Sequence, residues 1–215
     1  RISRTQTNRE YFKGDIDEVR VFDTVLTDDQ ISKIIYQEIQ NEGGNVAGAV
    51  VNKEIYDETT NQSISWSNLL AYYPMTDIIS YERTVDYSSN NIYTTLHNIT
   101  TFQDQTAPLP YETKADGPWE NEGTWLHGDV WDIEDIPNNT GSIVKINNKV
   151  STSAFHKHLA LIIEDGESLT VNSDKYINNS WYLELNGTLD LAGDSQLLQG
   201  INSDLVTSAS GKVLR

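Results

Sequence analysis

Three tryptophans that stand among acidic side chains are the residues best suited to chemistry. Trp119, Trp125 and Trp131 are interspersed with carboxylates at Glu112, Asp116, Glu120, Glu122, Asp129, Asp132, Glu134 and Asp135. A pair of carboxylates beside aromatic rings is what a glycosidase cleft uses, and aromatic rings alone serve in sugar sites that are not catalytic. The pattern makes the three tryptophans candidate ligand-binding residues. The favoured alternative is that they cover the open end of a repetitive fold, with the acids as a solvated rim.

Two histidines form a second candidate for chemistry. His156 and His158 flank Lys157, and on a strand residues two apart point to the same face. Two imidazoles on one face could bind a metal ion. No third ligand stands near them in the sequence, so we expect a surface strand instead. Because neither a Ser-His-Asp order nor a glycine-rich phosphate loop is present, we expect that the protein is not an enzyme.

The charge and the cysteine content of the chain limit the classes of partner and of site that we expect. The 215 residues include 32 acidic and 15 basic ones, which gives a formal net charge of −17. Nucleic acid and anionic membrane surfaces both need a basic face, so neither is an expected partner. The apolar runs are too short to cross a membrane, and we expect no membrane insertion. The absence of cysteine excludes disulfides and zinc–thiolate sites, and in an exported protein of this size it favours a bacterial source.

A repeat over residues 143–215 organises the chain. Short apolar strands of period 2 alternate with corners that contain Gly or Asn, as residues 183–191 illustrate. The corner glycines Gly166, Gly187 and Gly211 are 21 and 24 residues apart, a period typical of stacked solenoids. We expect these glycines to supply the positive φ of a tight turn. The repeat predicts parallel β-solenoid rungs, and the alternative is an antiparallel meander with hairpins at the same corners.

Residues 1–40 combine a strand with a short helix. Residues 12–20 read Phe-x-Gly-x-Ile-Asp-Glu-Val-Arg, and a capping box at Thr27 and Gln30 predicts a helix whose apolar face is Ile31, Ile34 and Ile35. This combination resembles the closing end of laminin G-like, concanavalin A-like jelly-roll modules. The resemblance implies that 1–40 is the end of such a module, most of which lies before Arg1.

A second segment, residues 66–106, resembles the opening of the same family. The run Leu-Leu-Ala-Tyr-Tyr-Pro-Met at 69–75 is similar to the first strand of these modules, and residues 86–91 resemble the turn that follows, with Ser89 in place of a glycine. This implies a degenerate or truncated module. Alternatively, the opening hairpin pairs with residues 11–22 in a minimal sheet. Residues 41–65, rich in Gly, Asn and Thr, are expected to form a linker.

The jelly-roll resemblance also implies a calcium site. In that family an Asp of the opening turn and the Asp of the Ile-Asp-Glu-Val strand help to hold the ion, together with backbone carbonyls. Carried over, the metal ligands are Asp17, Asp86 and Asn90, and the cofactor is Ca²⁺, which prefers hard oxygen ligands. The alternative is that Asp17 and Asp86, which stand in different modules, anchor turns or face solvent.

The remaining segments complete the predicted architecture. Residues 107–142, rich in Trp and Pro, resemble the entry to bacterial surface β-solenoids, and we expect them to cap the rungs of 143–215. The predicted fold class is all-β: the end of a laminin G-like jelly roll with one short helix, a linker, and a parallel β-solenoid. This arrangement resembles large multi-domain surface proteins of the Bacteroidetes, several of which serve in adhesion or gliding.

The resemblance implies an internal, non-catalytic segment of an exported adhesin on the bacterial cell surface, with glycans or other surface ligands as partners. One alternative is an accessory carbohydrate-binding region of a secreted polysaccharide-degrading enzyme. Another is a secretion substrate that contacts the bacterial secretion machinery. Thr24, in Asp23-Thr24-Val25, fits the Asp-Ser/Thr-apolar sequence that Bacteroidetes glycosylate at the hydroxyl.

Overall fold

The chain folds into two compact units, each assembled from two stretches of sequence. The structure is a computed structural model that describes residues 14, 16–76, 78–80, 83–96, 110–126, 128 and 142–215. The first unit comprises residues 1–25 and 66–103, and the second comprises residues 26–65 and 104–215. The expected modules are therefore interleaved, because the segment 26–65 joins the unit that contains the solenoid.

Two small antiparallel sheets form the described part of the first unit. β1 (Val19–Phe22) pairs with β4 (Leu69–Tyr73), and β5 (Ile78–Ser80), β6 (Arg83–Thr84) and β7 (Thr94–Thr95) form the other sheet. The 3-10 helix η1 (Trp66–Asn68) leads into β4. The pairing of β1 with β4 is the minimal sheet expected if the 69–75 strand joins residues 11–22. The laminin G-like jelly roll itself stays a prediction.

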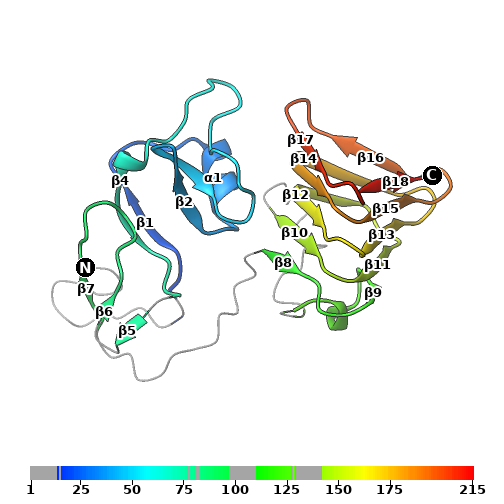
Figure 1. Ribbon diagram of the computed structural model, residues 1–215, viewed down its shortest axis with the longest axis horizontal. Helices are drawn as coiled ribbons and strands as arrows, with labels where there is room; N and C mark the ends of the chain where they lie inside the picture. The colour runs from blue at the N-terminus through cyan, green and yellow to red at the C-terminus, as the bar shows by residue number, and fades with distance from the viewer. Residues whose placement is uncertain are drawn as a thin grey trace. The chain divides into compact units, whose positions relative to one another are not determined.

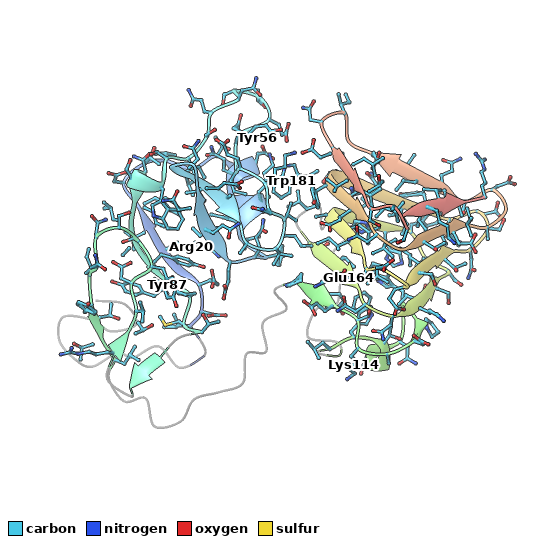
Figure 2. The ribbon with its side chains drawn as sticks, viewed as in Figure 1. Arg20, Tyr56, Tyr87, Lys114, Glu164 and Trp181 are labelled. Atoms are coloured by element: carbon cyan, nitrogen blue, oxygen red, sulfur yellow. The ribbon has the colours of Figure 1, made fainter. Side chains whose placement is uncertain are left out.

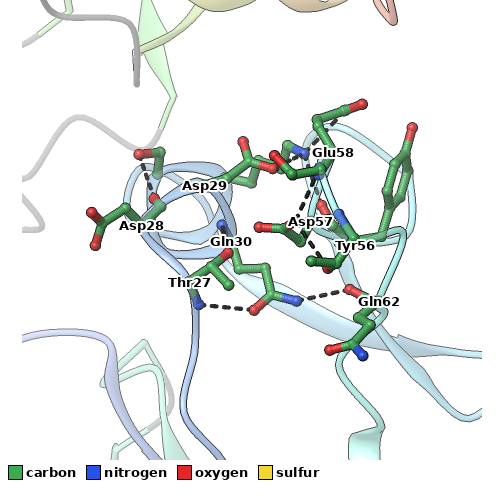
Figure 3. Close-up of polar contacts among 12 residues, drawn as sticks. Thr27, Asp28, Asp29, Gln30, Tyr56, Asp57, Glu58 and Gln62 are labelled. Atoms are coloured by element: carbon green, nitrogen blue, oxygen red, sulfur yellow. Dashed lines mark hydrogen bonds and ion pairs between the residues drawn. The ribbon is translucent and has the colours of Figure 1, made fainter.

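The second unit begins with the helix α1 (Asp28–Ile34). The predicted capping box is confirmed: the Gln30 amide donates to Thr27 Oγ1 over 3.3 Å, and the Thr27 amide donates to Gln30 Oε1 over 3.0 Å (Figure 3). Gln30 Nε2 also donates to the carbonyl of Gln62, which ties the start of the helix to the loop after Tyr56. Among the described residues, no helix is long and apolar enough to cross a membrane.

The buried face of α1 differs from the one predicted. Ile34 is buried, but Ile31 and Ile35 are 42% and 51% exposed. Lys33 is buried in their place, and its ammonium group contacts the carboxylates of Asp29 (2.8 Å) and Glu58 (3.1 Å). A buried ammonium group is tolerated only where such partners surround it. Because apolar periodicity carries no information on those partners, it did not identify Lys33 as a buried residue.

Residues 39–65 form a small antiparallel fold where the sequence predicted a linker. β2 (Ile39–Glu42) pairs with β3 (Asn45–Gly48) around a turn at Gly43 and Gly44, both with positive φ. Isolated bridges tie this hairpin to residues 54 and 65. The apolar residues buried here are Ile39, Val46, Ala47, Val51, Ile55 and Ile64. The glycines and asparagines therefore mark turns inside a folded segment.

The rest of the described second unit contains a parallel β-solenoid of about three turns, which confirms the prediction for 143–215. Two parallel sheets run side by side along its rungs (Figure 1). One sheet holds β8 (Tyr111–Glu112), β10 (Ile143–Ile146), β12 (His156–Ile163), β14 (Tyr176–Leu185), β16 (Gln196–Gln199) and β17 (Asp204–Thr207). The other holds β9 (Gly117–Pro118), β11 (Lys149–Thr152), β13 (Ser168–Val171), β15 (Thr188–Leu191) and β18 (Lys212–Leu214). The parallel pairing excludes the antiparallel meander.

Columns of apolar side chains fill the solenoid. Equivalent positions on successive rungs are direct partners, as in the column Val144, Leu161, Leu183 and Leu205. The three inner members of that column are 0–1% exposed. Because each rung buries its apolar surface only against its neighbours, stability grows rung by rung, as in other repeat proteins.

The corner glycines serve two different purposes. Gly166 has φ +80°, as predicted for all three, but Gly187 and Gly211 have no positive φ. A Cβ atom at Gly187 would clash with the carbonyl oxygens of Glu164 and Glu167, and one at Gly211 would clash with the carbonyl of Leu185. The expectation of a positive φ was therefore wrong at these two corners, where glycine is needed because the preceding rung approaches closely.

Candidate functional site

A cluster of three aromatic side chains, which we call the aromatic cap, consists of Tyr111, Trp119 and Trp125. The ring centroids of Tyr111 and Trp125 are 4.1 Å apart, and those of Trp119 and Trp125 are 4.8 Å apart. The indole N–H of Trp125 donates to the carbonyl of Trp119 over 2.6 Å. The cap belongs to the same buried cluster as Val144 and Val150, so it closes the core of the first complete rung.

Short elements position the aromatic cap. β8 and β9 pair in parallel with β10 and β11 and so form an incomplete first rung. The amide of Trp119 donates to the carbonyl of Ser151 over 2.7 Å. The 3-10 helix η2 (Glu122–Thr124) then starts at Asn121, whose side chain accepts from the amide of Gly123, and it brings the chain back to Trp125.

The predicted sugar-binding tryptophans are placed differently from one another. Trp119 and Trp125 are 3% and 2% exposed, so neither presents a ring face to solvent on which a sugar could stack. Their burial supports the alternative interpretation, in which they cover the end of the core. Trp131 lies outside the described residues. Sugar binding by these tryptophans stays a prediction, and for Trp119 and Trp125 it would require the cap to open.

Two buried histidines lie directly against the aromatic cap. His156 and His158 are 4% and 1% exposed, so the expectation of a surface strand was wrong. The centroid of the Trp119 indole is 4.2 Å from that of His156 and 6.2 Å from that of His158. Both rings face inward because the two histidines stand at the start of β12, before its apolar residues. There His156 pairs with the buried Ile177 of β14. The exposed Lys157 between them was the signal for this alternation.

A hydrogen-bonded chain connects His156 to a carboxylate. The hydroxyl of Thr152 donates to Glu120 Oε1 over 2.9 Å and lies 2.5 Å from His156 Nε2. Since that hydroxyl has a single proton, which goes to Glu120, the bond from His156 needs a proton on Nε2. The amide of Ala154 also donates to the Thr152 oxygen, whose capacity is then filled.

The electrostatics of this cluster favour neutral imidazoles. Burial lowers the pKa of His156 to about 4, against a smaller upward effect of Glu120. Burial, and to a smaller extent the neighbouring His156, lowers the pKa of His158 to about 3. Burial raises the pKa of Glu120, but hydrogen bonds from Ser153, its own amide and Thr152 outweigh this effect, and the net pKa is lowered.

The chain of Glu120, Thr152 and His156 contains the groups that activate a nucleophile, but its setting does not fit that role. A nucleophilic hydroxyl needs a base within hydrogen-bonding distance and a path for the substrate. Thr152 is 1% exposed and already has three hydrogen-bond partners. The chain therefore acts as a buried polar network that joins the first half-rung to β11 and β12.

The first unit contains the residues predicted to bind calcium. Asp86 is buried, and both of its oxygens accept hydrogen bonds: Oδ1 from the amides of Tyr72 and Ser88, and Oδ2 from the amide of Ile92 and the hydroxyl of Ser88. Burial raises the pKa of Asp86, but these hydrogen bonds outweigh it and the pKa is lowered. Asn90 lies in the same turn, and its side-chain Nδ2 donates to the carbonyl of Leu70. Asp86 thus anchors the turn to β4.

Asp17, the third predicted calcium ligand, lies just before β1 in the chain. Its Oδ1 accepts a hydrogen bond from the backbone amide of Glu18 over 3.0 Å. Glu18 in turn forms an ion pair with the guanidinium of Arg20, which is labelled in Figure 2. It also accepts a hydrogen bond from the hydroxyl of Tyr72 over 2.9 Å. Asp17 and Asp86 therefore belong to one folded unit, although the sequence placed them in different modules. Calcium binding by Asp17, Asp86 and Asn90 stays a prediction.

The predicted glycosylation residue, Thr24, is exposed just after β1. Its neighbour Val25 is 92% exposed, so the tripeptide around Thr24 is accessible to a modifying enzyme. Within the described part of the chain, no group of three or more His, Asp or Glu side chains is gathered to hold a metal ion. Comparisons with models of protein families, with curated proteins and with solved structures found no match.

Proposed function

We propose that this chain is a non-catalytic segment of an exported bacterial cell-surface protein, in which the solenoid spaces or presents an adhesive region. The observation that carries the proposal is the continuous stacking of rungs with direct apolar partners from β10 to β17. Such stacking makes an extended, stiff element whose outer face is free to vary, and this is how solenoid proteins build long binding surfaces.

The charge of the chain supports a role outside the cell on a hydrated surface. A net charge of −17 keeps the protein soluble and opposes binding to anionic polymers. Uncharged glycans and other surface ligands are therefore the proposed partners. Calcium at Asp17, Asp86 and Asn90 and a glycan at Thr24 are further elements of this proposal, the first as a structural ion and the second as a surface modification.

The test is a binding measurement with the purified chain on immobilised neutral and acidic polysaccharides, combined with a cleavage assay on the same polymers. We expect saturable binding to a neutral polysaccharide or to bacterial cells, with no release of reducing ends. Release of reducing ends would contradict the non-catalytic role. Binding that is seen only when this chain is part of a polysaccharide-degrading enzyme would favour the alternative, an accessory carbohydrate-binding region of such an enzyme.

A further inference from the structure

The buried imidazoles lie between the aromatic cap and the first complete rung. Trp119 packs against both rings, with its indole tilted by 30° to His156 and by 17° to His158. The hydroxyl of Thr152, on β11, accepts a hydrogen bond from His156 Nε2 and donates one to Glu120. Cap, rung and histidines thus share one packed cluster, and a change of charge on an imidazole acts directly on the packing of the cap.

The cluster has a place for neutral imidazoles but not for charged ones. A proton taken from solvent by His156 would go to Nδ1, because Nε2 already carries the proton that Thr152 accepts. His158 Nε2 has no hydrogen-bond partner among the described residues, and the ring is 1% exposed. A buried imidazolium without an acceptor loses its hydration without compensation.

Few charged groups of the described residues face these rings. Glu120 acts on His156 from the segment after β9, and His156 acts on His158 with the same sign once it is protonated. From β11 the facing side chain is Thr152, and from β14 the partners of the two histidines are Ile177 and Asn179, none of which is charged. Within the part of the chain that the structure describes, one carboxylate therefore faces the two imidazoles, and it acts on only one of them.

We propose that the aromatic cap is an acid-released element: protonation of His156 and His158 detaches it and uncovers the apolar end of the first complete rung, while the later rungs stay folded. The cap is attached by strands of only two residues, β8 and β9, whereas β12 and β14 span 8 and 10 residues. Because neighbouring rungs in a solenoid open separately, we expect the cap to open first, since it is held by these short strands and packs directly on the two titrating histidines.

The released state would expose Trp119 and Trp125, the rings that are too buried to bind sugars at neutral pH. The inference does not depend on the proposed adhesive function, since it concerns the stability of one element. Acidic medium is then the condition under which these aromatic rings become accessible.

NMR of the full chain as a function of pH tests this proposal. The indole N–H signal of Trp125, which is hydrogen-bonded to Trp119, reports on the cap, and the amide of Leu189 in β15 reports on the later rungs. We expect the Trp125 signal to lose its protection as the pH falls from 6.5 towards 4, while the Leu189 amide stays protected over the same range. The imidazole nitrogens should show neutral rings above the midpoint.

Matched variants identify the groups responsible. His158→Phe keeps an aromatic ring beside Trp119 but cannot be protonated, so we expect the midpoint of cap release to fall by about 0.5 pH unit or more. Lys157→Gln changes the exposed neighbour on the same strand and should leave the midpoint unchanged. If His158→Phe does not fold, Glu120→Gln serves instead: it keeps an acceptor for Thr152 but removes the charge that favours protonated His156 in the closed cap, so it should raise the midpoint.

Three results would overturn the proposal. The first is simultaneous loss of the Trp125 and Leu189 signals, which would mean global unfolding. The second is an unchanged midpoint in the foldable variant. The third is titration of His156 or His158 at the ordinary histidine pKa with the Trp125 signal still protected.

Discussion

His156 Nε2 and Thr152 Oγ1 lie 2.5 Å apart, and the imidazole is the donor in this buried hydrogen bond. The assignment follows from the third partner, Glu120, which takes the hydroxyl proton of Thr152. A single hydroxyl therefore fixes the tautomer of the histidine and holds the segment after β9 to β11. The bond contributes to stability only while all three partners keep these protonation states.

Replacing Thr152 with Val should test the value of this polar network. Val171 occupies the equivalent position on the next rung, so a branched apolar side chain fits the column. The variant would leave His156 Nε2 without its acceptor and remove one of the two hydrogen bonds to Glu120 Oε1, which keeps the amide of Ser153, and we expect a loss of roughly 2 kcal/mol in the free energy of unfolding. Thr170→Val, on the half-buried neighbouring position of β13, is the control. Equal unfolding midpoints in urea for both variants would contradict the network.

The free energy of unfolding should fall as the pH falls below 6.5. The unfolded chain binds protons on its imidazoles below that pH, whereas folded His156 and His158 bind them only near pH 4 and pH 3. The stabilisation is thus complete above pH 6.5 and is lost as the pH falls through the folded pKa values. At pH 5 we expect a loss of about 2 kcal/mol per histidine relative to pH 7.

Urea denaturation at pH 7 and pH 5 measures this difference. In His158→Phe one of the two titrating groups is gone, so the difference between the two pH values should shrink by about half. A chain whose free energy of unfolding is the same at both pH values would show that the imidazoles are not buried in their neutral form.

Gly187→Ala should destabilise the solenoid through a backbone clash. The new Cβ would meet the carbonyl oxygens of Glu164 and Glu167, which belong to the preceding rung and cannot move without breaking its hydrogen bonds. We expect a loss of about 2 kcal/mol or more, measured by thermal or urea unfolding. Gly123→Ala is a suitable control, because its Cβ would meet only the side chain of Asn121 at 3.2 Å. A similar small loss in both variants would rule out close approach as the reason for Gly187.

Thr27→Ala should weaken the start of α1 by about 1 kcal/mol, because the Gln30 amide loses its acceptor. The variant has a second readout. Thr27, followed by Thr60, holds the pKa of Asp57 at about 2 through hydrogen bonds, so the pKa of Asp57 should rise in the variant. Ser32→Ala, on the exposed side of the helix, should change neither quantity. NMR titration of Asp57 together with urea unfolding gives both measurements.

Calcium binding can be tested at Asp17 without disturbing the turn that Asp86 anchors. If the predicted ion is bound, the melting temperature should rise on addition of Ca²⁺ and return with a chelator, in line with mass action. Asp17→Asn should abolish that rise while preserving the fold. Asp86→Asn is less informative, because it also weakens the contacts with Tyr72 and Ile92. A melting temperature that does not respond to Ca²⁺ would contradict the site.

The elements with a local cause were predictable. The capping box at Thr27 places its donors and acceptors within four residues, and the rungs follow from apolar alternation and a period near 21 residues. The capping role of Trp119 and Trp125 also followed from the repeat, because the end of a stacked core must be covered. The apolar face of α1 was predicted only in part, since the buried Lys33 needs the carboxylate of Glu58, 25 residues away, as well as that of Asp29 on the same helix.

The sequence by itself therefore determined the repeating rungs and the start of the helix. These features depend on residue types at short, regular spacing, where backbone geometry leaves few choices. The structure decided for parallel stacking over the antiparallel meander. The tertiary structure decided that Glu18 meets Tyr72 across 54 residues and that His156 and His158 are buried against Trp119. Such outcomes depend on which distant segments pack together, because a polar side chain can be buried only where other parts of the chain supply its partners.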